Sequence, residues 1–336
     1  MKALILSAGL GKRLRPLTEV LPKPMLPILN RPVLEHMLEV LKKNGIHDVI
    51  VNLHHLSDKI INYFGSSIHY SREEKIMGTA GAIKKCQEFF GNETFLAING
   101  DIIADIDLKE ALSFHKKKRS IITLILREDE NLDQYEPIEI DSNGKIVRFP
   151  HSEMKNHVEG TTRVMFTGAQ IIEPEIFERI PVNRFCGTTD EIYPAILNEG
   201  IPIYGFQHKG YWRDMGNRRN YLIATEDALN KKVELMGLGK LNPNDKSIMP
   251  PVMIGENCSI SSYSQIGPYV VLGNGCRIEE GALIENSVCW NNVLVGTGGI
   301  VKDSILGHNI IIHPKQKISK RLGVQIGFNP TLTLSQ

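Results

Sequence analysis

The sequence predicts an α/β domain followed by a short coil of parallel strands. Three observations lead to this expectation. Short apolar runs alternate with stretches of helical spacing over most of the chain, which is typical of helices crossing over a parallel sheet. Glycines and cations directly follow the first of these runs. From position 254 to position 284, aliphatic residues recur at every sixth position, a period that indicates a repeat architecture.

Length and composition limit the function classes. A chain of 336 residues is long enough for two domains. Its net charge of +1 gives no general case for binding nucleic acid or membranes. The five cysteines include no Cys-x-x-Cys pair, which fits free thiols in a reducing cytoplasm. With no stretch of transmembrane length and no signal-peptide pattern, we expect a cytoplasmic protein with small-molecule partners, no nucleic acid and no membrane.

The first predicted strand leads into a loop suited to phosphates. Ala3 to Leu6 forms a short apolar run, enough for one buried strand of a parallel sheet. Gly9 and Gly11 follow, and glycines let backbone N–H groups turn toward a ligand. Lys12 and Arg13 bring positive charge to the same turn. A nucleoside triphosphate needs this combination.

Two common phosphate-binding motifs do not fit this loop. A Walker loop ending at Gly11 and Lys12 would place its first glycine on Leu6 and its hydroxyl on Arg13. A dinucleotide fingerprint would need a third glycine where Leu14 stands.

The whole stretch instead closely resembles the signature of sugar-1-phosphate nucleotidyltransferases. The matching residues are Gly9-Leu10-Gly11-Lys12-Arg13-Leu14, Pro16-Leu17-Thr18, Pro22-Lys23-Pro24-Met25 and Pro27-Ile28. The resemblance implies a Rossmann-like mixed sheet, and a reaction of an NTP with a sugar 1-phosphate that releases pyrophosphate. It also implies a set of nucleotide-binding loop residues, namely Ala8, Gly9, Gly11, Lys12 and Arg13.

Two cations of this stretch are candidate catalytic residues. Charge builds up on the phosphates in the transition state, so fixed cations and backbone dipoles would provide most of the catalysis. Arg13 would hold the triphosphate and later the pyrophosphate. Lys23, between Pro22 and Pro24, would reach the α-phosphate or the incoming sugar phosphate. A loop of solvated cations is the simpler alternative, but it does not require prolines on both sides of a lysine.

The chain continues with a helix over 32–44, a strand over 48–53 and a helix over 57–64. Gly78-Thr79-Ala80-Gly81 then begins a helix that runs through Phe90. A glycine-bounded helix start can bring backbone N–H groups to a base or ribose. In the resembled family such a motif contacts the base, which implies nucleotide binding by Gly78 and Thr79. A plain turn and helix cap is the alternative.

Two aspartates are the predicted metal ligands. Asn99-Gly100-Asp101 follows a strand over 94–98, and carboxyl ends of parallel strands are where such sheets bind ligands. Mg²⁺ prefers one or two carboxylates plus phosphate oxygens, so Asp101 is a candidate metal ligand and catalytic residue, beside a nucleotide contact at Gly100. An Asx turn is the alternative. The segment from Tyr211 to Asn217, before a helix over 218–229, resembles the family's second metal motif and implies that Asp214 completes the Mg²⁺ site.

The sugar side departs from the family pattern. Asn143-Gly144 between two short apolar runs predicts a hairpin. After such a hairpin the family usually carries Glu-Lys-Pro, but this chain has Phe149-Pro150-His151-Ser152. Arg148 and Lys155 are open candidates for the missing cation. In the strand predicted over 163–172, Thr167 and Gly168 resemble the family's sugar-facing pair, and a glycine within a strand marks a close approach.

The six-residue period resembles the left-handed parallel β-helix of hexapeptide transferases. The in-phase residues are Ile254, Ile260, Ile266, Leu272, Ile278, Ile284 and Trp290, then Ile300, Leu306 and Ile312 after a four-residue slip. We expect a catalytic domain over 1–232, a linker over 233–250, the β-helix over 251–318 and a tail over 319–336. Packing or building a homo-oligomer is the favoured role of the β-helix. An acyltransferase using His308 or His313 is the alternative.

The predicted activity is nucleotidyl transfer from an NTP to a sugar 1-phosphate, with Mg²⁺ as cofactor. GTP with mannose 1-phosphate or a similar sugar phosphate is favoured, because Gly78 to Gly81 looks most like the purine-accepting members. Thymidylyl enzymes tend to carry a glutamine near this position, and the nearest here, Gln87, lies well within the helix. Specificity for UTP, CTP or dTTP, and a non-catalytic regulatory member of the family, are the alternatives.

Overall fold

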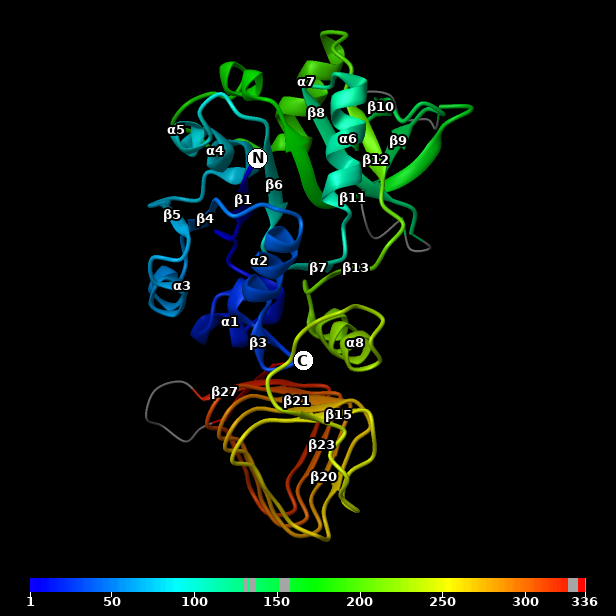
Figure 1. Ribbon diagram of the computed structural model, residues 1–336. Helices are drawn as coiled ribbons and strands as arrows, with labels where there is room; N and C mark the ends of the chain where they lie inside the picture. Colours follow the sequence, from blue (N-terminus) through cyan, green and yellow to red (C-terminus); the bar gives the residue numbers. More distant parts are fainter. Residues whose placement is uncertain (130–131, 133–136, 151–157, 326–331, 336) are drawn as a thin grey trace. The chain divides into compact units, whose positions relative to one another are not determined.

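The computed structural model describes residues 1–129, 132, 137–150, 158–325 and 332–335 (Figure 1). The chain divides into two compact units, each assembled from stretches that are far apart in the sequence. The first unit comprises Met1–Gly9, Glu39–Gly100 and Asp105–Trp212. The second comprises Leu10–Leu38, Asp101–Ala104 and Arg213–Gln336. Within the described residues, no helix combines the length and apolar character needed to cross a membrane.

A nine-stranded mixed sheet forms the centre of the first unit. Strands β5-β4-β1-β6 are parallel, β11 pairs antiparallel with β6 and β8, and β12 runs parallel to β8. The strand order reverses beside β1, which is where open α/β sheets bind ligands. The strands are β1 (Lys2–Leu6), β4 (Val49–Leu53), β5 (His69–Arg72), β6 (Phe95–Asn99), β8 (Ile122–Arg127), β9 (Ile138–Ile140), β10 (Ile146–Arg148), β11 (Thr162–Ile172) and β12 (Tyr204–Gln207). The predicted mixed sheet and its hairpin, β9–β10, are confirmed.

Helices pack on this sheet. In Figure 1, α6 (Leu108–Lys118) lies along the sheet, where it contacts β8, β11 and β12. The predicted helix over 78–90 is divided at Cys86 into α4 (Gly78–Lys85) and α5 (Gln87–Phe90). The other helical segments are α3 (Ser57–Phe64), a 3₁₀ helix η4 (Pro174–Glu178), a π-helical turn η5 (Thr188–Ile192) and α7 (Tyr193–Asn198).

Short segments build the first part of the second unit. The hairpin-like pair β2 (Pro27–Ile28) and β3 (Arg31–Pro32) closes the signature stretch, and α2 (Val33–Lys43) begins here and enters the first unit at Glu39. β7 (Ile102–Ala104) pairs with β13 (Trp212–Asp214), which leads into α8 (Arg218–Leu229). The remaining elements are the 3₁₀ helices η1 (Lys12–Leu14) and η2 (Lys23–Met25), and α1 (Leu17–Val20).

The rest of the second unit is a coil of parallel strands with three faces (Figure 1). The predicted β-helix is therefore present. One face consists of β15 (Val252–Ile254), β18 (Val270–Leu272), β21 (Ser287–Cys289), β24 (Ile305–Leu306) and β27 (Leu322–Gln325). The second consists of β16 (Ser259–Ile260), β19 (Arg277–Ile278), β22 (Leu294–Val295) and β25 (Ile311–Ile312). The third consists of β17 (Gln265–Ile266), β20 (Leu283–Glu285), β23 (Ile300–Lys302) and β26 (Lys317–Ser319).

The predicted phase of the repeat is wrong at Trp290 and Ile300, whereas Leu306 and Ile312 lie in the core of the coil as predicted. Leu272 stacks on Cys289 rather than on Trp290, and Ile284 stacks on Val301 rather than on Ile300. The reason is that the corner after β20 is one residue shorter than the hexapeptide rule requires. Cys289 and Val301 belong to the core of the coil, whereas Trp290 does not. Trp290 is nevertheless only 1% exposed, and its indole N–H donates to a residue outside the coil, Tyr221 on α8.

The segments predicted as linker and tail both carry structure. The Leu238 N–H donates to the Leu29 carbonyl over 2.9 Å, and β14 (Lys240–Leu241) pairs antiparallel with β15. At the other end, β27 stacks on β24 beyond position 319, and β28 (Leu332–Ser335) pairs with β27. The compact units divide the chain along different lines from the predicted domain boundaries, which stay a prediction.

Candidate active site

Tight packing fixes Gly11, Arg13 and Thr18 of the signature stretch. Gly11 has a φ of 58°, a left-handed conformation that favours glycine. A Cβ atom there would lie 2.7 Å from Cγ2 of Thr18, whose hydroxyl donates to the Gly11 carbonyl over 3.0 Å. Arg13 follows in η1, and its Nη2 would lie 2.7 Å from a Cβ atom at Gly216. The absence of a side chain at Gly216 therefore makes room for the Arg13 guanidinium.

Lys23 forms an ion pair with Asp101. Pro22 precedes η2 in extended conformation, and Pro24 occupies its first turn, so the backbone of Lys23 has little freedom. The Lys23 side chain is 12% exposed and that of Asp101 is 28% exposed. The pair therefore sits at a partly solvated position, where both groups can meet a ligand. The structure brings together these two predicted catalytic residues from positions far apart in the sequence.

Asp101 and Asp214 lie close together through their backbones. β7 starts directly after Asp101 and pairs with β13, which ends at Asp214. The Met215 N–H donates to the Asp101 carbonyl over 2.9 Å. Asp214 accepts the Gly216 N–H over 2.5 Å and the Asn220 side-chain amide over 3.3 Å, so its carboxylate is oriented by the start of α8.

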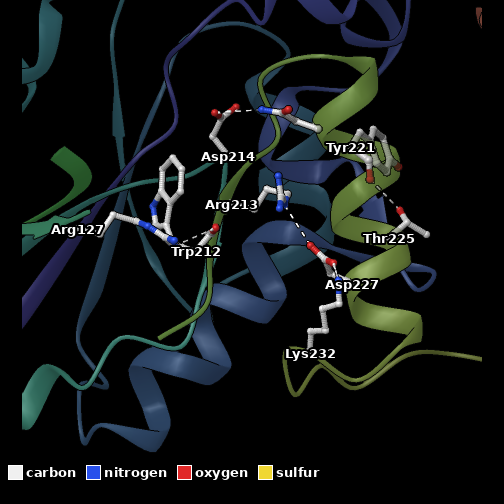
Figure 2. A network of polar contacts seen from close by, with 9 residues as sticks. Arg127, Trp212, Arg213, Asp214, Tyr221, Thr225, Asp227 and Lys232 are labelled. Carbon is white, nitrogen blue, oxygen red and sulfur yellow. Dashed lines mark hydrogen bonds and ion pairs between the residues drawn. The ribbon is translucent and has the colours of Figure 1, made fainter. Parts of the chain in front are cut away.

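A buried carboxylate anchors the strand before Asp214 (Figure 2). Asp227 on α8 is 2% exposed. It accepts from Nε of Arg213 over 3.2 Å and from Nζ of Lys232 over 2.8 Å. The hydrogen bond to Asp227 raises the pKa of Lys232. This network ties β13 to α8. Sequence reasoning missed it because Asp227 belongs to no motif and the motif around Asp214 assigns no role to Arg213.

The residues fit a magnesium ion bound together with substrate. Mg²⁺ is commonly held by one or two carboxylates plus phosphate oxygens, rather than by a cage of protein ligands. Asp101 and Asp214 supply two carboxylates, and no cluster of three or more His, Cys, Asp or Glu residues with metal-binding geometry occurs within the described ranges. The donor set therefore suits a metal that arrives with phosphates.

The predicted nucleotide-binding residues of the first unit lie around the ends of β1 and β6. Ala8 is buried, whereas a Cβ atom at Gly9 would meet open space. The Gly100 N–H donates to the Leu6 carbonyl over 2.8 Å, and a side chain at Gly100 would collide with Oγ of Ser7. Open backbone at the end of β1 is compatible with a ligand, and these assignments stay predictions.

The start of α4 is partly occupied by the protein itself. Gly78 has a φ of 74°, and a side chain there would collide with the Cys186 carbonyl. That carbonyl accepts the N–H groups of Ala80 and Gly81 over 3.0 and 3.3 Å. The Thr79 hydroxyl accepts the Thr188 N–H over 2.9 Å. Only the first N–H groups of α4 are therefore candidates for binding the nucleotide base. The nucleotide-binding roles of Gly78 and Thr79 stay predictions.

The predicted sugar-binding residues, Thr167 and Gly168, make their contacts within the sheet and its neighbouring strands. Thr167 is 1% exposed; its hydroxyl donates to the Ile125 carbonyl over 2.7 Å, and its carbonyl accepts the Trp212 indole N–H over 2.8 Å. Gly168 has a φ of 84°, and a Cβ atom there would lie 2.5 Å from the side chain of Asn99. The glycine is required by packing against Asn99. A sugar contact of either residue stays a prediction.

One of the two candidates for the cation that replaces the family's Glu-Lys-Pro lysine already has a partner within the protein. Arg148 forms an ion pair with Glu139, which is fully buried. Glu139 also accepts the Val158 N–H over 2.9 Å and the Thr161 hydroxyl over 3.1 Å. The charge of Arg148 is thus already neutralised within the protein. Lys155, the other candidate, lies outside the described residues.

The histidines considered for acyl transfer lie on the coil. His308 is exposed, its ring centroid lies 5.0 Å from that of Trp290, and its Nδ1 accepts the Asn291 N–H over 3.2 Å. His313 is exposed as well. His308 therefore has a role in the packing of the coil.

Comparison with known proteins matches both parts of the chain. Residues 2–231 match the family model described as nucleotidyl transferase, and residues 248–335 match the model of the GMPPB C-terminal domain. UTP–glucose-1-phosphate uridylyltransferase from Synechocystis sp. is 33% identical over 339 positions, which cover 91% of this chain and 87% of that protein. The mannose-1-phosphate guanylyltransferase catalytic subunit beta of Xenopus tropicalis is 30% identical and covers 93% of this chain and 92% of that protein.

Solved structures share the fold of about two thirds of the chain. HddC from Yersinia pseudotuberculosis, complexed with GMP-PN, superposes with a TM-score of 0.56 and 25% identity, covering 67% of this chain and 98% of HddC. A putative glucose-1-phosphate thymidylyltransferase from Bacillus anthracis superposes with a TM-score of 0.59 and 25% identity, covering 70% and 97%.

Proposed function

Since the chain belongs to the nucleotidyl transferase family, among its sugar-1-phosphate nucleotidyltransferases, we propose that it uses GTP and mannose 1-phosphate, or a similar sugar phosphate. Alignment with mannose-1-phosphate guanylyltransferases over both parts of the chain carries this proposal. The relative from Xenopus tropicalis covers 93% of the chain, including the coil. The helix start at Gly78 to Gly81, which looks most like the purine-accepting members, supports the same base.

The proposed mechanism assigns roles to residues of the second unit. A sugar-phosphate oxygen attacks the α-phosphorus of the NTP in line, while the bond from that phosphorus to the pyrophosphate oxygen breaks. The attacking oxygen is already an anion at neutral pH, so no general base is needed. Arg13 neutralises charge on the departing pyrophosphate, and Lys23 neutralises charge at the α-phosphate or the sugar phosphate. Asp101 and Asp214 would hold a Mg²⁺ ion, which when bound neutralises further charge on the phosphates.

The name of another relative favours a different pair of substrates. The relative from Synechocystis sp., at 33% identity, bears the name UTP–glucose-1-phosphate uridylyltransferase and also aligns with 91% of the chain. UTP with glucose 1-phosphate is therefore the competing pair of substrates. A pocket that hydrogen-bonds one base rejects a base that leaves its polar groups unpaired, by a large factor. The two proposals therefore predict clearly different rates.

A substrate panel decides between them. Each of ATP, GTP, CTP, UTP and dTTP is combined with mannose 1-phosphate and with glucose 1-phosphate in the presence of Mg²⁺, and pyrophosphate release is measured. We expect the highest kcat/KM for GTP with mannose 1-phosphate. A preference for UTP with glucose 1-phosphate would refute the guanylyl proposal. No turnover with any pair, together with tight binding of an NDP-sugar by calorimetry, would refute catalysis and indicate a regulatory member.

A further inference from the structure

Trp290 points out of the coil and into the rest of the second unit. The shortened corner after β20 shifts it out of the core positions that Cys289 and Val301 occupy. Its indole N–H donates to the hydroxyl of Tyr221 on α8 over 3.3 Å. Both side chains are buried, with exposed fractions of 1% for Trp290 and 0% for Tyr221. The coil thus meets α8 through a polar contact that is shielded from water.

Tyr221 also forms a hydrogen bond with the signature stretch. Its hydroxyl donates to the carbonyl of Pro27 over 2.5 Å. Because the hydroxyl accepts one hydrogen bond and donates another, the three groups form a chain of hydrogen bonds in which each bond polarises the next. Pro27 is half-buried, and a carbonyl that is shielded in part from water loses stabilisation when its donor is removed, so the Pro27 position depends on this hydroxyl.

Pro27 is coupled to Lys23 by a short, stiff backbone. The Leu26 N–H donates to the Lys23 carbonyl over 3.1 Å, and the Val33 N–H donates to the Leu26 carbonyl over 3.1 Å. Pro24 and Pro27 remove two rotatable φ angles from this segment. A displacement of Pro27 therefore moves Lys23 relative to Asp101, its ion-pair partner.

The same turn of α8 also reaches the second aspartate. Asn220, which precedes Tyr221, donates to Asp214 over 3.3 Å, and α8 is fixed at its start by the side chain of Asn217, which caps the Asn220 N–H over 2.9 Å. Tyr221 accepts the Thr225 hydroxyl at its carbonyl over 3.0 Å. Figure 2 shows Tyr221 and Thr225 on this helix.

We propose that Tyr221 and Trp290 are positioning residues that hold Lys23 in its reactive place, so that the coil contributes to catalysis through a buried hydrogen-bond relay. A second set of contacts supports this. Asn30, just beyond Pro27, donates from its side-chain amide to the carbonyls of Leu238 and Leu272, both over 2.9 Å. The proposal rests on the proposed function, since it assigns the relay to the placement of Lys23.

Tyr221→Phe is the direct test, because it removes the hydroxyl and keeps the ring. Misplacement of a reacting group by about 1 Å costs up to about a hundredfold in rate. We expect kcat to fall by about ten- to a hundredfold, while KM for the NTP changes less than about twofold. Trp290→Phe keeps the bond from Tyr221 to Pro27, so its effect should be in the same direction and smaller.

The matched control is Tyr193→Phe in the first unit. Tyr193 is also fully buried, and its hydroxyl donates to the Gln170 side chain over 2.6 Å. The control loses the same kind of bond, so a comparable fall in Tm with unchanged kcat is expected. If Tyr193→Phe lowers kcat as much as Tyr221→Phe, the relay has no special role and the proposal is refuted.

A readout without activity separates this proposal from the proposed function. Hydrogen–deuterium exchange of peptides covering 22–29 should be faster in Tyr221→Phe than in wild type and unchanged in Tyr193→Phe. Unchanged exchange in these peptides, or full kcat in Tyr221→Phe, overturns the relay while an active wild type leaves the proposed function intact. If wild type is inactive throughout the substrate panel but exchange increases as expected, the proposed function and the contribution to catalysis are refuted, whereas the hold of Tyr221 on the segment that carries Lys23 is confirmed. If Tyr221→Phe does not fold, Trp290→Phe carries both measurements.

Discussion

Replacing Lys23 by alanine should damage catalysis far more than folding. The Lys23 and Asp101 side chains are 12% and 28% exposed, so solvent screens their attraction in part. Ion pairs that are accessible to solvent typically contribute about 0.2–1 kcal/mol to stability. For a domain of this size, that corresponds to a fall in Tm of at most about 4 °C.

The expected effect on the rate is larger. Removal of a fixed electrostatic stabiliser commonly lowers kcat by about 10²–10³, equivalent to about 2.7–4 kcal/mol. The prolines on both sides of Lys23 hold the cation in place before substrate arrives, and such preorganised charge acts mainly on the transition state. Lys23→Ala should therefore lower kcat by about this factor and change the Kd of the NTP only slightly.

The assay measures pyrophosphate release at saturating substrates, with NTP binding by calorimetry and Tm by thermal unfolding. The control is Lys302→Ala, which removes a lysine from a Lys–Glu pair of the coil at 2.7 Å. It should leave kcat within about twofold of wild type. If NTP binding collapses in Lys23→Ala while the rate per bound enzyme is unchanged, Lys23 serves ground-state binding and the reasoning is wrong.

Three further predictions concern the metal, a buried histidine and a thiol. Asp101→Asn and Asp214→Asn should each lower turnover by about a hundredfold or more with the fold retained, and full activity in EDTA would contradict the metal site. Burial lowers the pKa of His115 below its ordinary value of 6.5; because the unfolded chain then binds more protons, stability should fall as pH drops below 6.5, and thermal unfolding of His115→Gln should lose this dependence. A hydrogen bond from Cys276 lowers the pKa of Cys258 to about 7, so iodoacetamide at pH 7.5 should label Cys258 first, as mass spectrometry of wild type and Cys258→Ser can show.

Much of the fold could be predicted because local signals and tertiary packing agree. Ser57 and Gly65 predict the start and end of the helix over 57–64, and the structure has this helix and the one predicted over 218–229 at α3 and α8 with the same ends. The mixed sheet follows from alternating apolar runs. The division at Cys86, whose φ of −92° and ψ of 9° leave the helical region, could not be predicted, because no glycine or proline marks it in the sequence.

The phase of the coil shows a different limit. Aliphatic residues stand at both the true and the rejected positions, since Ile300 and Val301 are adjacent and both apolar. A period read from side-chain type alone cannot choose between them. The choice depends on the length of the corner after β20, where Asn286 adopts a left-handed φ of 42°. Left-handed asparagines occur at other corners of the coil as well, at Asn257, Asn292 and Asn309, so this residue type does not locate the shift.

The sequence predicts the ion-paired side chains of the candidate site but not the backbone atoms around them. Lys23 and Asp101 stand out in the sequence because the predicted chemistry needs charge, and the structure pairs them. Their supports are carbonyl groups, which every residue possesses: Pro27 accepts from Tyr221, Asp101 accepts from the Met215 N–H, and Asp303 on the coil accepts from Arg218 over 2.7 Å.

Substitutions in the second unit should differ in effect between residues that accept hydrogen bonds through the backbone and residues that donate them through side chains. A carbonyl acceptor survives substitution of its own side chain, whereas the donor does not. Substitution of the acceptor residues Leu238, Leu272 or Asp303 should therefore leave the loop contacts in place, so long as the backbone keeps its course. Substitution of the donors Asn30 or Arg218 should release them. The residues that fix these contacts are thus the donors: Asn30 and Arg218 outside the coil, and Trp290 on the coil, whose indole N–H donates to Tyr221.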